Sequence, residues 1–168
     1  MTTKSNLLKK FRIVLCKTSH AGNIGSVARA MKTMGFSDLY LVNPKDFPSD
    51  HANALSCGAE DILRKANVVS SLGAALKDIN HVIGFTARKR ELTQPHKNVR
   101  ELSGQLINEA SDNSIAIIFG NETNGLSNIE LQQCQTLGFI DASLKYSSLN
   151  LAHSVQIVCH EIRMMSNL

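Results

Sequence analysis

The sequence lacks the residues that several common classes of protein require. It has no Trp and only two Tyr among its 168 residues, which argues against a large aromatic platform for stacking nucleic-acid bases. Its four Cys form no CxxC pair, so neither a zinc site nor a disulfide framework is expected. Its six His form neither HxxxH nor HExxH, and no nucleophile elbow is present, so a hydrolase is not supported.

No long apolar run occurs near the amino terminus. Residues 1–10 are polar and basic, and the apolar run Phe11–Cys16 is far too short for a signal peptide or a membrane span. Together with the absence of cysteine pairs, this predicts a soluble protein of the reducing cytoplasm, with no membrane partner and no metal.

The composition is typical of a folded protein with a basic surface. Hydrophobic residues make up 43% of the chain, which is enough to bury a core. Charged residues make up only 19%, which argues against a disordered chain. The formal net charge of +4 and the pI near 9.0 favour a polyanionic partner without identifying one. No internal repeat, low-complexity segment or linker divides the chain, so we expect a single domain over residues 1–168.

Short apolar runs alternate with longer segments of helical period. Strands are expected at residues 11–16, 38–42, 67–70, 81–85, 114–119 and 138–142. Helices are expected at residues 24–34, 52–65, 72–77, 99–110, 129–135 and 149–165. This alternation predicts an α/β fold around a mostly parallel sheet, and the run IAIIF, apolar on both faces, is typical of a central strand.

Two of the expected helices have informative faces. In the helix at 24–34, Arg29 falls nearly opposite the apolar stripe, so it should point away from the core. In the helix at 149–165, one apolar stripe is formed by Leu151, Val155, Val158, Ile162 and Met165. Ile157 and Met164 are apolar on another side, which indicates packing on the chain's own sheet and on a second subunit.

A glycine-bearing turn at residues 19–26 (SHAGNIGS) joins the first strand to the first long helix. It has neither the Lys-Ser/Thr pair of a phosphate loop nor the GxGxxG spacing. It is therefore either a plain turn or a site that holds an anion at the helix N-terminus. Arg29, taken alone, is either a solvated surface residue or a functional one.

Three later segments are open to both a structural and a functional interpretation. Residues 119–126 (FGNETNGL) place two Gly around a polar run at a strand's carboxyl end, which suits either a ligand or a turn. In residues 146–154 (YSSLNLAHS), Ser147 or Ser148 could cap the last helix. A basic segment could grip phosphates or form a solvated loop, and it contains Arg88, Lys89 and Arg90.

Three stretches of the chain, taken in order, resemble the motifs of the TrmH-type 2′-O-ribose methyltransferases of the SPOUT superfamily: RIVL…TSHAGNIGSVARAMKTMGF, IIFGNETNGL and YSSLNLAHSVQ. The resemblance extends from Phe11 to Met165 and is nearest to the tRNA-modifying members. It implies a SPOUT fold, in which a mostly parallel sheet flanked by helices carries a deep C-terminal trefoil knot, here at about residues 114–165. It also implies a homodimer that binds S-adenosylmethionine within the knot.

The resemblance implies roles for individual residues as well. Cofactor contacts are implied for Phe85, Thr86, Ala87, Gly120, Ile140, Ser147, Ser148 and Leu149. Arg29 matches the family's catalytic arginine, and Asn23, Glu122 and Asn150, with Ser148, match its supporting polar set. Arg88, Lys89 and Arg90 would contact RNA. One departure is Asn121, because this branch commonly has an Arg there that is available to RNA.

The implied reaction is methyl transfer from S-adenosylmethionine to a ribose 2′-hydroxyl of tRNA, at the cytidine or uridine of position 32 in the anticodon loop. In the family the arginine is proposed as the general base. A guanidinium gives up its proton only with great difficulty, so Arg29 could instead polarise the hydroxyl or hold the adjacent phosphate.

Two alternatives remain open. One is 2′-O-methylation of rRNA or of the tRNA wobble nucleotide, and the other is a non-catalytic RNA-binding protein. The tRNA-modifying members usually extend beyond the SPOUT domain, and the absence of such an extension after Leu168 predicts weaker tRNA binding.

Overall fold

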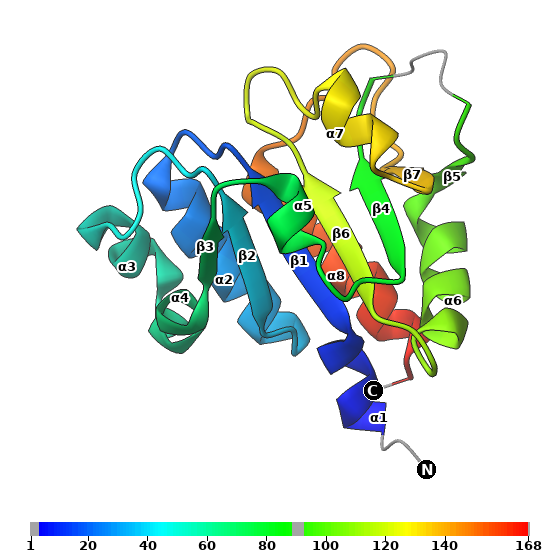
Figure 1. The fold of residues 1–168 in the computed structure, drawn as a ribbon, viewed down its shortest axis with the longest axis horizontal. Coiled ribbons are helices and arrows are strands. Elements are labelled where there is room, and N and C mark those ends of the chain that lie inside the picture. The colour runs from blue at the N-terminus through cyan, green and yellow to red at the C-terminus, as the bar shows by residue number, and fades with distance from the viewer. Residues whose placement is uncertain (1–3, 89–92, 168) are drawn as a thin grey trace.

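A seven-stranded sheet forms the centre of the structure, a computed structural model that describes residues 4–88 and 93–167 (Figure 1). The strands are β1 (Phe11–Cys16), β2 (Asp38–Val42), β3 (Asn67–Val69), β4 (His81–Phe85), β5 (His96–Asn98), β6 (Ile115–Phe119) and β7 (Thr136–Phe139). Their order in the sheet is β3-β2-β1-β6-β4-β7-β5, and each of these pairings is parallel. The expected α/β fold with a mostly parallel sheet is confirmed.

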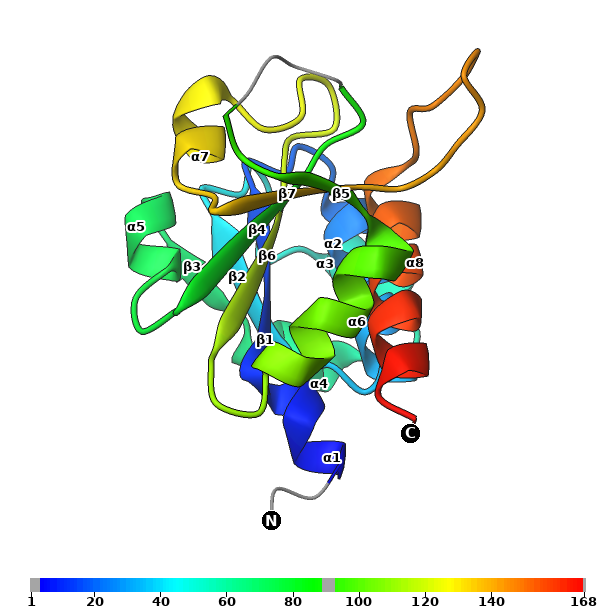
Figure 2. The same cartoon turned by 90° about the vertical axis from the view of Figure 1, so that its right-hand side faces the viewer.

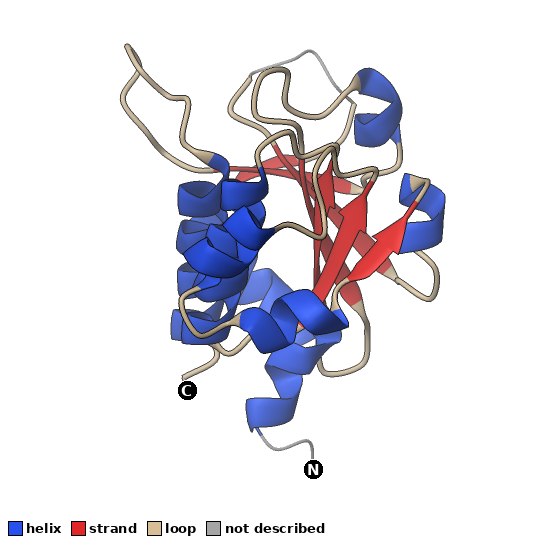
Figure 3. Ribbon diagram, turned by 90° about the vertical axis from the view of Figure 1, so that its left-hand side faces the viewer, coloured by secondary structure: helices blue, strands red, loops and turns tan. Residues whose placement is uncertain are grey.

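Helices cover both faces of the sheet. They are α1 (Lys4–Leu7), the 3-10 turn η1 (Leu8–Lys10), α2 (Ala21–Met34), α3 (Asp50–Ser56), α4 (Glu60–Lys65), α5 (Leu72–Ala75), α6 (Val99–Glu109), α7 (Asn128–Gln132) and α8 (Leu151–Met165). The longer helices α2, α6 and α8 share one face with α3 and α4, while the short α5 and α7 lie on the other (Figures 2 and 3). No helix among the described residues is long and apolar enough to cross a membrane.

The central strands supply side chains to two buried clusters, because successive residues of a strand point to opposite faces. Ile13 and Ile117 join the cluster that includes α2, α6 and α8. Val14 and Ile118 join the smaller cluster under α5 and α7. Every residue of β6 is buried, as the run IAIIF predicts.

The structure corrects several predicted boundaries. Strand β5 was not predicted, and the strand expected at residues 138–142 lies earlier in the chain, as β7. The helix expected at residues 52–65 is interrupted between α3 and α4, because Cys57 and Gly58 adopt left-handed backbone angles with φ of 46° and 93°.

The start of α8 also differs from the prediction. Asn150 is the N-cap, and its side-chain oxygen accepts hydrogen bonds from the backbone N–H groups of Ala152 and His153 at 2.8 and 3.3 Å. The prediction that Ser147 or Ser148 caps this helix is therefore wrong. Asn150 satisfies the free N–H groups of the first turn from the position directly before the helix.

The faces of α2 and α8 largely follow the sequence pattern. Arg29 is exposed on α2, as predicted. Val155, Val158 and Ile162 of α8 are fully buried against the chain's own core. Met165, expected in the same stripe, is exposed.

Candidate active site

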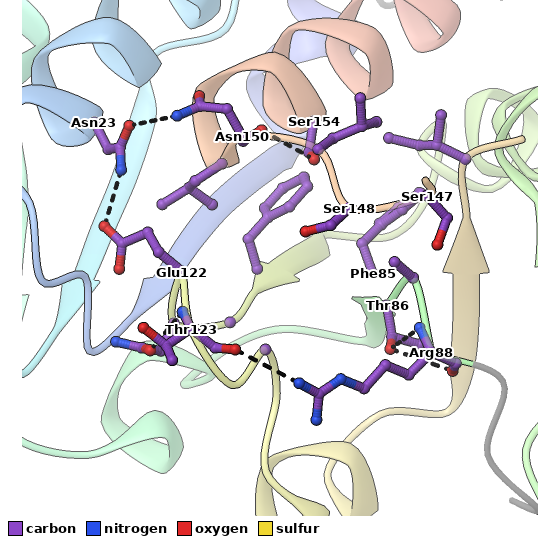
Figure 4. A pocket seen from close by; sticks show the side chains of 18 of the residues that line it. Asn23, Phe85, Thr86, Arg88, Glu122, Thr123, Ser147, Ser148, Asn150 and Ser154 are labelled. Atoms are coloured by element: carbon purple, nitrogen blue, oxygen red, sulfur yellow. Dashed lines mark hydrogen bonds between the residues drawn. The ribbon is translucent and has the colours of Figure 1, made fainter. Parts of the chain in front are cut away.

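A cavity of about 420 Å³ lies at the edge of the sheet where β4, β6 and β7 end (Figure 4). Because these strands are parallel, the loops that follow them converge at one edge, where open α/β sheets bind ligands. The wall contains all eight residues for which the resemblance implies cofactor contacts: Phe85, Thr86, Ala87, Gly120, Ile140, Ser147, Ser148 and Leu149. Segments that are distant in the sequence thus form one concave site.

Close packing beneath the cavity depends on glycine. The rings of Phe85 and Phe119 stack with their centroids 5.6 Å apart. A Cβ on Gly138 would lie 2.6 Å from the ring of Phe85, so only glycine leaves room for this stack. A Cβ on Gly120 would lie 2.1 Å from the carbonyl carbon of Gly125, which means that the loop after β6 folds directly back over Gly120.

A chain of hydrogen bonds beside the cavity joins the three sequence motifs (Figure 4). Asn23 Nδ2 donates to Oε1 of Glu122 at 3.0 Å. Asn150 Nδ2 donates to Oδ1 of Asn23, also at 3.0 Å. The structure therefore brings together three of the four residues predicted to be catalytic, one from each motif.

The Glu122 carboxylate accepts four hydrogen bonds. Ser19 donates from its N–H and Oγ to Oε2 at 2.9 and 2.8 Å, while the His20 N–H and Asn23 Nδ2 donate to Oε1 at 3.1 and 3.0 Å. Partial burial raises the pKa of Glu122, but the hydrogen bonds from Asn23 and Ser19 outweigh burial and lower it to about 2.

The ionised carboxylate of Glu122 also sets the direction of the hydrogen bonds between these three side chains. A carboxylate only accepts hydrogen bonds, so Asn23 must turn its NH₂ group toward Glu122 and its oxygen toward Asn150. Asn150 then presents its own NH₂ group to Asn23 and its oxygen to the start of α8.

A second cavity, of about 700 Å³, borders the first between the starts of α2, α3 and α8. Three residues line both cavities: His20, Asn23 and Asn150. His51 and His153 also line the second cavity. Within the described part of the chain, the rings of these three histidines make no hydrogen bond, and no group of His, Cys, Asp and Glu is arranged to hold a metal ion.

Arg29, the fourth residue predicted to be catalytic, lies apart from this network. It is six residues beyond Asn23 on α2, about 9 Å along the helix axis at 1.5 Å per residue. It lines neither cavity. Its guanidinium has no hydrogen bond or ion pair with any residue that the structure describes.

The basic segment after β4 is described only in part. Arg88 lines the first cavity, and its Nη2 donates to the carbonyl of Thr123 at 3.5 Å (Figure 4). Lys89 and Arg90 lie outside the described residues. No RNA contact of this segment is tested by the structure.

Asn121, the position where an Arg is common, shapes the loop in this chain. Its Nδ2 donates to the carbonyl of Lys17 at 2.7 Å, and its Oδ1 accepts from the N–H of Thr123 at 2.9 Å. The side chain therefore ties the loop after β6 to the end of β1.

The sequence did not single out several other residues of the two walls. Ser19 and His20 hold Glu122 through their N–H groups, and Tyr146 and Ser154 line the first cavity. Each of these lies within a predicted motif, so its position in the motif was an available signal. Asp46, His51 and Leu55 line the second cavity from outside the motifs, and no signal in the sequence pointed to them.

The chain is similar to known proteins in both sequence and fold. Residues 10–160 match the SpoU rRNA Methylase family. The tRNA (cytidine/uridine-2′-O-)-methyltransferase TrmJ of Sodalis glossinidius is 51% identical over 157 residues, which cover 94% of this chain and 62% of that protein. The TrmJ of Photorhabdus laumondii is 49% identical over 158 residues, or 66% of its length, so this chain spans less than two thirds of these curated relatives.

A solved structure has the same fold. A methylase family protein of Haemophilus influenzae Rd KW20 superposes with a TM-score of 0.90 at 48% identity, covering 95% of this chain and 67% of that one. The resemblance found in the motifs is confirmed by these matches over nearly the whole chain. The chain belongs to the SpoU rRNA Methylase family.

Proposed function

We propose that the protein transfers a methyl group from S-adenosylmethionine to a ribose 2′-hydroxyl of tRNA. The observation that carries this proposal is the first cavity, whose wall unites the eight predicted cofactor residues beside the Asn23–Glu122–Asn150 chain. The names of the similar TrmJ proteins give tRNA cytidine or uridine as the substrate. We extend this to position 32 of the anticodon loop and place the enzyme in the cytoplasm with its substrate.

The cofactor would lie in the first cavity. Apolar Ile140 and Leu149 would pack against its adenine, and Thr86, Ser147 and Ser148 would supply polar contacts at the wall. S-adenosylmethionine supplies an electrophilic methyl group on a sulfonium. We also propose that residues 114–165 form the deep trefoil knot of SPOUT domains, within a single domain over residues 1–168, with this cavity at the knot.

The second cavity would hold the acceptor nucleotide. An in-line displacement needs the 2′-oxygen about 3 Å from the methyl group, so donor and acceptor must meet at a shared wall. Asn23 and Asn150 form that wall, and their fixed amides can orient the ribose.

We propose that the protein is a homodimer through α8. Ile157 is half-buried and Met164 is 47% exposed, so both leave apolar surface on the side of α8 away from its own core. Light scattering at micromolar concentration is expected to give the mass of two chains. The mass of one chain would contradict this assembly.

Arg29 would bind a phosphate of the RNA outside the two cavities, because its charged side chain is exposed and has no hydrogen bond or ion pair with any described residue. Arg29→Ala is expected to raise the KM for RNA about tenfold or more, because the variant loses a charge-assisted hydrogen bond that contributes about 1.5–3 kcal/mol to binding. The slope of log affinity against log salt concentration for RNA binding should also become shallower by about one. The affinity for S-adenosylhomocysteine should not change.

The control is Arg64→Ala, which removes an exposed arginine that lines neither cavity. If Arg29 instead acts on the hydroxyl, kcat would fall by about 10²–10⁴-fold and the salt dependence would stay the same. The split between kcat and KM therefore decides between the two roles.

The proposed reaction is tested by incubating the protein with labelled S-adenosylmethionine and separate tRNA and rRNA fractions. Label is expected in tRNA, at a nucleotide whose 3′ linkage resists alkaline cleavage, since a 2′-O-methyl group removes the attacking hydroxyl. Label in rRNA alone would favour the ribosomal alternative. Binding of S-adenosylhomocysteine without transfer to any RNA would favour a non-catalytic RNA-binding protein.

A further inference from the structure

His20 lies where the two cavities meet. It lines both of them, together with Asn23 and Asn150, and it is the one titratable residue among those described that does so. Its side chain is exposed, and its ring has no hydrogen-bonding partner within the described part of the chain. The ring is therefore free to bind a ligand at the junction.

The backbone of His20 is held in place although its ring is free. Its N–H donates to Oε1 of Glu122 at 3.1 Å, and its carbonyl accepts from the N–H of Asn23 at 3.0 Å. It is also the N-cap residue of α2, but its side chain makes no capping hydrogen bond. The imidazole is thus positioned by the network without being used by it.

The other candidates for the proton acceptor are poorly suited. Glu122 accepts four hydrogen bonds, and its pKa of about 2 makes it a weak base. Arg29 lines neither cavity, and a guanidinium stays protonated. Arg88 and Tyr146 line only the first cavity, whereas Asp46, His51 and His153 line only the second.

We propose that His20 is the general base of the methyl transfer, an inference that rests on the proposed function. A neutral ring nitrogen of His20 takes the proton of the ribose 2′-hydroxyl while the oxygen forms a bond to the methyl carbon. The bond between that carbon and sulfur breaks, and its electron pair stays on the sulfur, which changes from a sulfonium to a neutral thioether. The imidazolium then releases its proton to water.

Titratable groups line the two cavities together with His20: Arg88, Glu122 and Tyr146 in the first, and Asp46, His51 and His153 in the second. Glu122 lies in the loop after β6, Asp46 in the loop after β2, His51 on α3 and His153 on α8. The two carboxylates would stabilise the imidazolium that forms in the reaction. An imidazole is also the side chain whose ordinary titration suits a base near neutral pH.

The test compares His20→Ala and His20→Asn with the wild-type protein. We expect kcat to fall about 100-fold or more in both variants, which is the usual contribution of a positioned base. The KM for tRNA and the affinity for S-adenosylhomocysteine should change less than threefold, since Asn23 and Asn150 remain in place. The wild-type rate should fall as the pH is lowered, because a protonated ring can no longer accept the hydroxyl proton, and the variants should lose this dependence.

Two further measurements separate a base from a structural residue. Added imidazole should restore part of the rate of His20→Ala, because it can enter the space left by the ring. The melting temperature should stay near that of the wild type, since no capping hydrogen bond is lost. Lys65→Ala, at an exposed residue of α4 that lines neither cavity, is the control and should behave as the wild type.

Two outcomes would overturn the inference while leaving the proposed function intact. One is a kcat for both His20 variants within threefold of the wild type. The other is a lowered kcat with an unchanged pH profile and no response to imidazole, which would make His20 a positioning residue. A wild-type protein that methylates no RNA would contradict the proposed function itself.

Discussion

Leu149→Arg is expected to abolish the binding of S-adenosylhomocysteine and, with it, methyl transfer. Leu149 lines the first cavity in the loop before α8 and is 37% exposed. The substitution replaces apolar surface that would cover the adenine with a long charged side chain, which would lose its hydration when the adenine enters. Calorimetric titration should give saturable heat with the wild type and none with the variant.

The matched control is Leu144→Arg in the same loop. Leu144 is 99% exposed and does not line the cavity, and the loop that carries it projects from the body of the molecule (Figure 2). This variant should bind S-adenosylhomocysteine with wild-type affinity. Equal loss in both variants would mean that the whole loop folds incorrectly, and no loss in either would place the adenine elsewhere.

The central strands were predictable because their residues reflect burial on both faces. Apart from Arg12, the residues of the runs FRIVLC and IAIIF are apolar, and these runs form β1 and β6. Strand β5 consists of His96, Lys97 and Asn98, whose types do not favour a strand. It forms because the chain is held beside β7, a contact that no local pattern encodes.

The cofactor wall was predictable because each of its segments follows a strand. Parallel strands send their carboxyl ends to one edge, so residues 85–87, 120 and 140 must lie near one another once the sheet forms. The hydrogen bond between Asn23 and Asn150 joins residues 127 positions apart. It depends on α2 and α8 packing side by side, which the sequence did not define.

The second cavity was beyond prediction for a related reason. Its far wall comes from α3, which the sequence placed in a single helix at residues 52–65. The approach of α3 to α2 depends on Gly22 and Gly25, where a Cβ would lie 2.7 Å from His51 Nε2 and 2.1 Å from the carbonyl oxygen of Ala52. Arg29 shows the same limit, since its face of α2 was predictable but its distance from the cavities was not.

Gly120→Ala is expected to disrupt the first cavity. The added Cβ would lie 2.1 Å from the Gly125 carbonyl carbon and 2.2 Å from the Leu126 nitrogen, and both are backbone atoms. The loop is closed there by the Gly125 N–H, which donates to the Asn121 carbonyl at 2.8 Å, and by a left-handed Gly125 with φ of 67°. The loop must therefore open, because no side chain can move aside.

Opening this loop would displace Glu122 from its four donors and remove one wall of the cavity. We expect Gly120→Ala to lose measurable binding of S-adenosylhomocysteine and to melt at a lower temperature, the usual result of overpacking by about 1–3 kcal/mol. Gly104→Ala is the control, because a Cβ at Gly104 on α6 meets nothing within 4 Å. That variant should keep its affinity and gain up to about 1 kcal/mol from helix propensity. Wild-type affinity in Gly120→Ala would show that the loop after β6 is not part of the cofactor site.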